Sequence, residues 1–210
     1  MVIEKIGWFK RRMGDIGKRL FFNKSEKMNL LLTSAIVQST IEEYTSIMGG
    51  SLPDALKLFG EGVKAQALDL VTEAIETPIL FGLKLAFLLS KEPSDIAIQM
   101  GFTFWGLAGK MSKEHFTKPK FISAEESEDN IAKVIIGVKK CPVCIGLTNV
   151  TEKDLQGEDY ITVLSALSEA AIQDIQDYVG NKYKIVCKET KCFLRGDDQG
   201  EMTLYFHPIT

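Results

Sequence analysis

Between residues 30 and 75, apolar side chains recur every three or four positions, which places them on one face of an α-helix. This pattern predicts a helix from Leu30 to Met48 that ends at Gly49-Gly50. A second helix follows, with Ser51 as its cap and apolar positions from Leu56 to Ile75, and Pro78 marks its end or a kink. We therefore expect two consecutive helices in this part of the chain.

Residues 79–109 are the most apolar part of the chain, and Lys91-Glu92-Pro93 divides them into two runs. Neither run reaches the roughly 20 unbroken apolar residues that a membrane span needs. We interpret both as helices buried on most sides. Five aromatic residues in these runs are then either core residues or the lining of an internal pocket: Phe81, Phe87, Phe102, Phe104 and Trp105.

The pattern changes after about residue 117. The charged run at 123–130 is typical of a loop, and the apolar spacing of 160–178 predicts an amphipathic helix. Strands are predicted at 133–139, 183–191 and 202–207. The turn sequence Arg195-Gly-Asp-Asp198 joins the last two strands into a predicted hairpin. A run of helices followed by strands and one more helix indicates a single α+β domain.

The charge is unevenly distributed. Residues 1–24 carry a net charge of +5, and residues 25–210 carry −8, so we separate a basic N-terminal extension (1–24) from the domain (25–210). The acidic domain disfavours general nucleic-acid binding, which needs clustered cations. In the extension, one helical face would carry Ile6, Phe9, Met13, Ile16 and Leu20. This helix either packs on the domain or on a second subunit, or lies on an anionic membrane or nucleic acid; disorder is the third alternative.

Few residues are candidates for catalysis. The only histidines are His115, in a predicted loop, and His207, at the end of the last predicted strand, and neither pairs with a nucleophile at an interpretable spacing. The chain has none of the Gly-rich or nucleophile motifs of common enzymes. No secretion signal is visible, so we expect a soluble cytoplasmic protein with reduced thiols that is not an enzyme.

The cysteines form the one group with specific chemistry. Cys141-x-x-Cys144 has the spacing of half a zinc site, which Cys187 and Cys192 could complete. Residues five apart on a regular strand face opposite sides, so that completion requires a bulge or bend. An iron–sulfur centre would use the same ligands. The alternatives are a redox dithiol at Cys141 and Cys144, and free thiols with a structural role.

The C-terminal half resembles the vinyl-4-reductase domain family, which shares a fold with the vesicle-tethering TRAPP subunits. The resemblance lies in KVIIGVKKCPVCIGL, DYITVLSALSEAAIQDI and YKIVCKETKCFLRGDDQGEMTLYF, and extends upstream into IEEYTSIMGGSLPDALKLFGEGVKAQALDLV. It implies a helical layer on a mainly antiparallel sheet, a homodimer, and an internal pocket for a hydrophobic small molecule. Leu164 and Leu167 would join the aromatic residues in lining that pocket.

The same resemblance implies a zinc site near the hairpin, with Glu189 and Cys192 at two of its ligand positions. The next ligand position holds Gly200, and no cysteine lies around 163–166, so the family's site is incomplete here. Cys141, Cys144 and Cys187 would have to replace the missing ligands. The leading hypothesis is a hydrophobic-ligand sensor or carrier, with or without zinc. A protein-interaction or membrane-peripheral adaptor and a thiol redox sensor are the alternatives.

Overall fold

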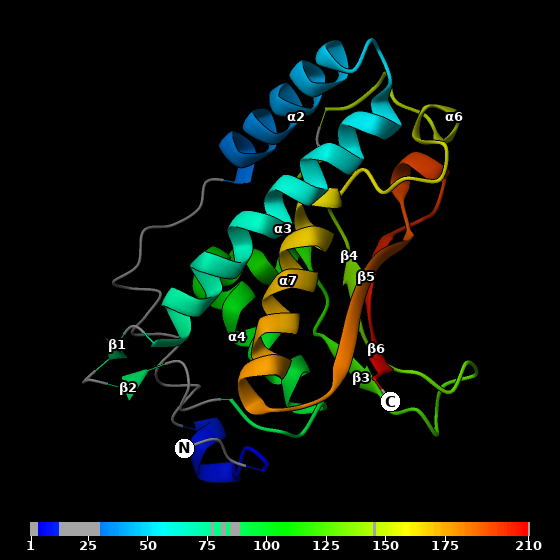
Figure 1. Ribbon diagram of the computed structural model, residues 1–210. Coiled ribbons are helices and arrows are strands. Elements are labelled where there is room, and N and C mark those ends of the chain that lie inside the picture. The colour runs from blue at the N-terminus through cyan, green and yellow to red at the C-terminus, as the bar shows by residue number, and fades with distance from the viewer. Residues whose placement is uncertain are drawn as a thin grey trace.

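Helices cover one face of a four-stranded antiparallel sheet in the computed structural model (Figure 1). The structure describes residues 4–12, 30–76, 78–80, 83–84, 89–144 and 146–209. The longer helices are α2 (Leu30–Ile47), α3 (Leu52–Glu76), α4 (Asp95–Ala108) and α7 (Thr162–Val179). Helix α7 lies against the sheet, α3 packs on α7, and α2 packs on α3. The predicted α+β class and its helical layer are confirmed.

The sheet has the strand order β3-β4-β6-β5, with every neighbouring pair antiparallel. Its strands are β3 (Lys120–Ile122), β4 (Ala132–Val138), β5 (Tyr183–Lys191) and β6 (Gly200–Pro208). Strands β5 and β6 form the predicted hairpin, which passes through the short 3-10 helix η3 (Phe193–Arg195). The register shifts between Glu189 and Lys191, so a bulge interrupts β5 where the sequence hypothesis required one.

The alternation of side chains along β5 buries Ile185, Cys187 and Glu189, while Lys184 and Lys188 are exposed. The same pattern in β6 buries Met202, Leu204 and Phe206. Helix α7 adds Ile172, Ile175 and Val179 to this core. The carboxylate of Glu189 is therefore buried on the same face of β5 as the side chains of Ile185 and Cys187.

The end of α2 and both ends of α3 lie close to where the sequence predicted them, and glycine, serine and proline residues mark these boundaries. Helix α2 ends before Gly49 and Gly50, which have φ of 66° and 91°, values that glycine adopts without strain. The hydroxyl of Ser51 accepts a hydrogen bond from the main-chain N–H of Asp54 at 3.4 Å and so caps α3. Helix α3 ends at Glu76, before Pro78.

Two predictions about local structure were wrong. The first apolar run was expected to be helical, but it contains the short strands β1 (Pro78–Leu80) and β2 (Leu83–Lys84), which pair with each other. A short apolar run carries no period that separates helix from strand, so only α4 follows the prediction. The predicted loop around His115 contains the 3-10 helix η2 (Gly109–Met111) and α5 (Ser112–His115), and His115 is buried. Strand β3 and the short helix α6 (Glu152–Leu155) were not predicted from the sequence.

The described part of the N-terminal extension is a helical turn at residues 8–12. Ile6 is buried and Phe9 is exposed, so these two residues do not share the predicted apolar face. The hydrogen bond from the Ile6 main-chain N–H to Asp95 holds the chain just before this turn, and the Trp8 and Phe9 side chains that follow are exposed. Met13, Ile16 and Leu20 lie outside the described residues.

Among the residues that the structure describes, no helix is both long enough and apolar enough to cross a bilayer.

Candidate ligand-binding cleft

A cleft of about 480 Å³ lies between α3, α7 and β5. Lys64 of α3 forms one part of its wall, and the loop before α7 contributes Asp159. Helix α7 supplies Thr162, Ser165 and Glu169, β5 supplies Cys187 and Glu189, and Arg195 follows from η3. The wall is therefore rich in charged and hydrogen-bonding groups, which differs from the apolar pocket expected from the sequence.

Glu189 is the buried acid of this cleft, with 5% of its surface exposed. Burial raises the pKa of Glu189 from 4.5 to about 7, and the nearby Asp159 carboxylate adds to the rise. Hydrogen bonds from the Cys192 thiol and the Ile161 main-chain N–H oppose it. The second carboxylate oxygen, Oε2, has no hydrogen-bond partner among the described residues. A buried polar atom without a partner is costly, so Oε2 is suited to receive a group from a bound molecule.

Arg195 fixes the surroundings of Glu189. Its Nη1 donates to the main-chain oxygen of Glu189 at 2.8 Å, and its Nη2 donates to Asp159 Oδ1 at 3.0 Å. The other Asp159 oxygen accepts the main-chain N–H of Glu189 at 2.7 Å. The planar guanidinium thus connects the bulged end of β5 to the loop before α7. The positive charge of Arg195 also acts on Glu189 and lowers its pKa, against the larger effect of burial.

The two buried free cysteines lie on either side of the bulge. Burial raises the pKa of Cys187 well above its usual value, and the carboxylate of Glu169 adds to the effect. Burial also raises the pKa of Cys192 to about 12, helped by the adjacent carboxylate of Glu189. Both thiols are therefore neutral near pH 7, which makes them poor nucleophiles.

The predicted metal ligands fall into separate places. Cys141 and Cys144 are joined to each other by a disulfide, whereas Glu189 and Cys192 are hydrogen-bonded partners near the cleft. Among the described residues, no group of three or more His, Cys, Asp or Glu side chains could hold a metal ion. This arrangement does not bring the predicted ligands to one point, and the zinc or iron–sulfur centre stays a prediction.

The predicted apolar pocket lies largely outside the described side chains. Phe81 and Phe87 are in undescribed segments, and the side chains of Phe102, Phe104 and Trp105 are also outside the description, although α4 contains their backbone. Leu164 packs against the core, but Leu167 is 40% exposed on α7. An α-helix turns by about 100° per residue, so positions three apart can still differ in burial at the edge of its apolar face.

Two ion pairs of the cleft were not predicted from the sequence: Lys64 with Glu169, and Arg195 with Asp159. Arg195 was interpreted only as part of a turn. That turn is present, since Asp197 accepts the main-chain N–H of Cys192 at 2.7 Å. The histidines lie elsewhere: His115 Nδ1 is 3.0 Å from the Lys140 carbonyl oxygen, and the His207 ring stacks on Tyr205.

No known protein family matches the chain, and no curated protein matches it either. A solved structure does match: trafficking protein particle complex subunit 3 from Naegleria fowleri, covalently bound to palmitic acid. The match covers 84% of this chain and 99% of the other, with a TM-score of 0.51 and 16% sequence identity. This is a TRAPP-like fold. At this identity the TRAPP-like match shows the fold alone, and the resemblance to the vinyl-4-reductase family stays a prediction.

Proposed function

We propose that this protein is a non-enzymatic binding module, a sensor or carrier, for a small amphiphilic molecule. The polar group of the ligand, a hydroxyl or an amine, would occupy the cleft between α7 and β5. The observation that carries the proposal is the unpaired Oε2 of Glu189, a buried carboxylate oxygen on a residue that lines that cleft. A ligand donor at this position would satisfy an atom that the described residues leave unpaired.

The fold supports a ligand-binding role. The TRAPP-like neighbour holds a palmitic acid, so this architecture accommodates a hydrophobic chain in at least one protein. The cleft is lined by four acidic residues, Glu158, Asp159, Glu169 and Glu189, and by three basic ones, Lys64, Lys188 and Arg195, so a free carboxylate ligand would meet a small excess of negative charge. We therefore favour an alcohol or amine over a fatty acid in this chain.

The chemistry of the cleft favours binding over catalysis. The thiols of Cys187 and Cys192 have raised pKa values and are held neutral. Arg195 and Lys64 are engaged by the carboxylates of Asp159 and Glu169. Fixed ion pairs of this kind orient a ligand's polar group without supplying an activated nucleophile.

A series of ligands with one tail and different head groups tests the proposal. Dodecylamine, dodecanol and dodecanoic acid would be titrated into the protein by calorimetry at about pH 8, where Glu189 is ionised. We expect the amine and the alcohol to bind and the acid to bind weakly. Glu189→Gln should weaken amine binding about tenfold, because a charge-assisted hydrogen bond is lost.

The matched control is Glu152→Gln, which removes an exposed carboxylate from α6 and should leave binding unchanged. Equal amine binding by the wild type and Glu189→Gln, or no binding of any of the three compounds, would refute the proposal. The predicted homodimer and cytoplasmic location remain predictions of the sequence. Sedimentation velocity would test the dimer.

A further inference from the structure

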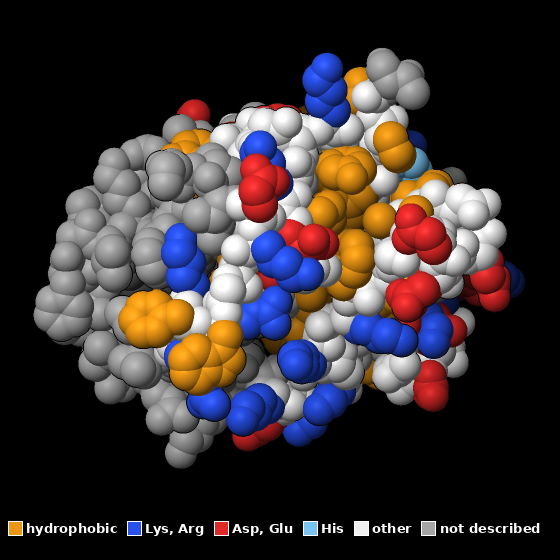
Figure 2. Space-filling model, turned by 90° about the horizontal axis from the view of Figure 1, so that it is seen from below, with side chains coloured by type: hydrophobic (Ala, Val, Ile, Leu, Met, Phe, Trp, Pro, Cys, Tyr) orange, Lys and Arg blue, Asp and Glu red, His pale blue; other side chains and the backbone are white. Residues whose placement is uncertain are grey.

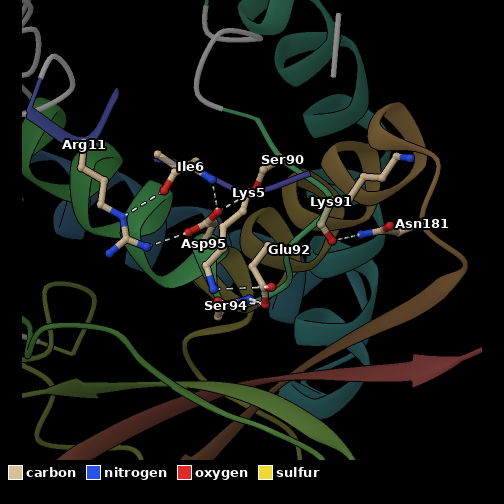
Figure 3. Close-up of polar contacts among 9 residues, drawn as sticks. All are labelled: Lys5, Ile6, Arg11, Ser90, Lys91, Glu92, Ser94, Asp95 and Asn181. Carbon is tan, nitrogen blue, oxygen red and sulfur yellow. Dashed lines mark hydrogen bonds and ion pairs between the residues drawn. The ribbon is translucent and has the colours of Figure 1, made fainter. Parts of the chain in front are cut away.

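One buried carboxylate holds the start of the described chain against the domain (Figure 3). Asp95 is fully buried, and its Oδ2 accepts hydrogen bonds from the Ile6 main-chain N–H at 2.7 Å and from the Ser90 hydroxyl at 2.8 Å. Its Oδ1 pairs with the Arg11 guanidinium at 3.2 Å. The Arg11 Nε also donates to the Ile6 carbonyl oxygen at 3.3 Å. The segment between residues 6 and 11 is therefore fixed at both ends.

Two large aromatic side chains project from this fixed segment. Trp8 is 71% exposed and Phe9 is 67% exposed, although the preceding Ile6 is buried. Single exposed apolar residues are common on soluble proteins, but two adjacent aromatic rings on an anchored turn form a compact apolar tip. We call residues 8 and 9 the aromatic tip.

Positive charge surrounds the aromatic tip. Residues 4–12 contain Lys5, Lys10, Arg11 and Arg12 against Glu4, a net charge of +3 for this segment, within which Lys5 pairs with Glu92 and Arg11 with Asp95 of the domain. The Arg12 guanidinium lies 5.7 Å from the centre of the Trp8 ring. On the face seen from below, hydrophobic side chains stand at the surface beside a run of Lys and Arg side chains (Figure 2).

The basic surface continues beyond the extension. Arg11 lines a surface hollow together with Lys118 and Lys120, which precede and begin β3. Both lysines are exposed. Segments more than a hundred residues apart in sequence thus contribute cations to one face, although residues 25–210 together carry −8.

We propose that this face docks on an anionic lipid bilayer, with Trp8 and Phe9 inserted among the head groups and the surrounding cations facing lipid phosphates and carboxylates. Tryptophan and phenylalanine beside Lys and Arg are the combination that interfacial membrane segments use. A single-stranded nucleic acid would instead need a groove that follows its backbone past several stacking rings, and one helical turn offers two. This surface is separate from the cleft and needs no ligand there.

The test is sedimentation of the full chain with vesicles, either pure phosphatidylcholine or equal parts phosphatidylcholine and phosphatidylserine. We expect binding to the mixed vesicles, weakened by salt, and little binding to the neutral ones. The double substitution Trp8→Ala/Phe9→Ala should weaken binding about tenfold or more. Arg12→Gln should weaken it about fivefold, the contribution of one cation near an anionic surface.

Matched controls remove similar groups elsewhere. Ile36→Ala/Ile47→Ala takes two exposed apolar side chains from α2, and Lys153→Gln takes one exposed cation from α6. Both should bind as the wild type does. A blue shift of tryptophan emission on vesicle addition should disappear in Trp8→Phe. Equal binding by the wild type and the aromatic double variant, equal binding to neutral vesicles, or binding of a single-stranded oligonucleotide without binding of vesicles would overturn the proposal.

Discussion

The carboxylate of Asp95 and the main-chain amide of Ile6 are 89 residues apart in sequence and 2.7 Å apart in space. This contact attaches the described part of the basic extension to the beginning of α4. Ion pairs between Lys5 and Glu92 and between Lys91 and Glu4 lie at the same junction. Residues 4–12 of the extension therefore contact the domain through polar groups, while the aromatic tip is exposed.

Loss of the Asp95 carboxylate should destabilise the protein. In Asp95→Ala, the Ile6 amide and Ser90 hydroxyl lose their acceptor and Arg11 loses its ion pair, at a cost of about 3 kcal/mol in the free energy of unfolding. Urea denaturation measures this change. The exposed Asp198→Ala serves as the control and should stay within about 0.5 kcal/mol of the wild type. An unchanged midpoint in Asp95→Ala would show that the extension is not attached in this way.

Glu189 should make the free energy of unfolding depend on pH. Its pKa in the folded protein is about 7, above the ordinary value of 4.5, so the folded state binds a proton more tightly than the unfolded state. The free energy of unfolding should therefore fall as the pH rises from about 4.5 to about 7. Glu189→Gln stays neutral, so the difference between variant and wild type should grow in favour of the variant across this window. Parallel stability curves for the two proteins would contradict the assignment.

Arg195 should not tolerate replacement by lysine. Its guanidinium donates to the Glu189 and Glu158 carbonyl oxygens and to the Asp159 carboxylate, and an ammonium group cannot reach three acceptors in that planar arrangement. We expect Arg195→Lys to lower the free energy of unfolding by about 1–2 kcal/mol, measured by chemical denaturation. The control is Lys153→Arg at an exposed position of α6, which should leave the free energy of unfolding unchanged. Equal stability of Arg195→Lys and the wild type would mean that these hydrogen bonds contribute nothing.

The four cysteines should differ in their reactivity toward an alkylating reagent, because two form a disulfide and two are free thiols. Alkylation of the unfolded chain without reductant should modify only the two free residues, Cys187 and Cys192, and reduction should add Cys141 and Cys144. In the folded protein, the raised pKa values predict slow modification of both free thiols. Mass spectrometry gives the counts, and metal analysis of the same sample provides the control. One zinc per chain with four protected thiols would contradict this pairing and support the metal hypothesis.

Hydrophobic spacing and turn sequences predicted those helices and strands that are determined by residues close together in the chain. The β5–β6 hairpin follows from the alternation of side chains and a turn sequence, and α3 follows from Ser51 and the apolar spacing behind it. The strands β1 and β2 were missed because their short apolar run fits helix and strand equally well. Non-local contacts could not be predicted: Asp95 follows the Lys91-Glu92-Pro93 break by two residues, and nothing near it in sequence indicates its pairing with Ile6.

In the candidate cleft, too, features that depend on neighbouring residues were predicted and non-local contacts were not. Resemblance to a known family pointed to Glu189 and Cys192, and the structure does bring them together. The unpaired oxygen of Glu189 depends on burial and on the simultaneous positions of Arg195 and Asp159, which no spacing in the sequence reveals. The charged character of the cleft could not be predicted either, because Lys64 lies on α3 and its ion-pair partner Glu169 lies on α7.

Native mass spectrometry of the wild-type protein and of Glu189→Gln, both equilibrated with dodecylamine, tests the proposed ligand site most directly. We predict one bound molecule on the wild-type chain and a marked loss of that complex in Glu189→Gln, with Glu152→Gln behaving as the wild type. An unliganded wild-type chain, or equal occupancy of the wild type and Glu189→Gln, would contradict the assignment of the cleft as the binding site.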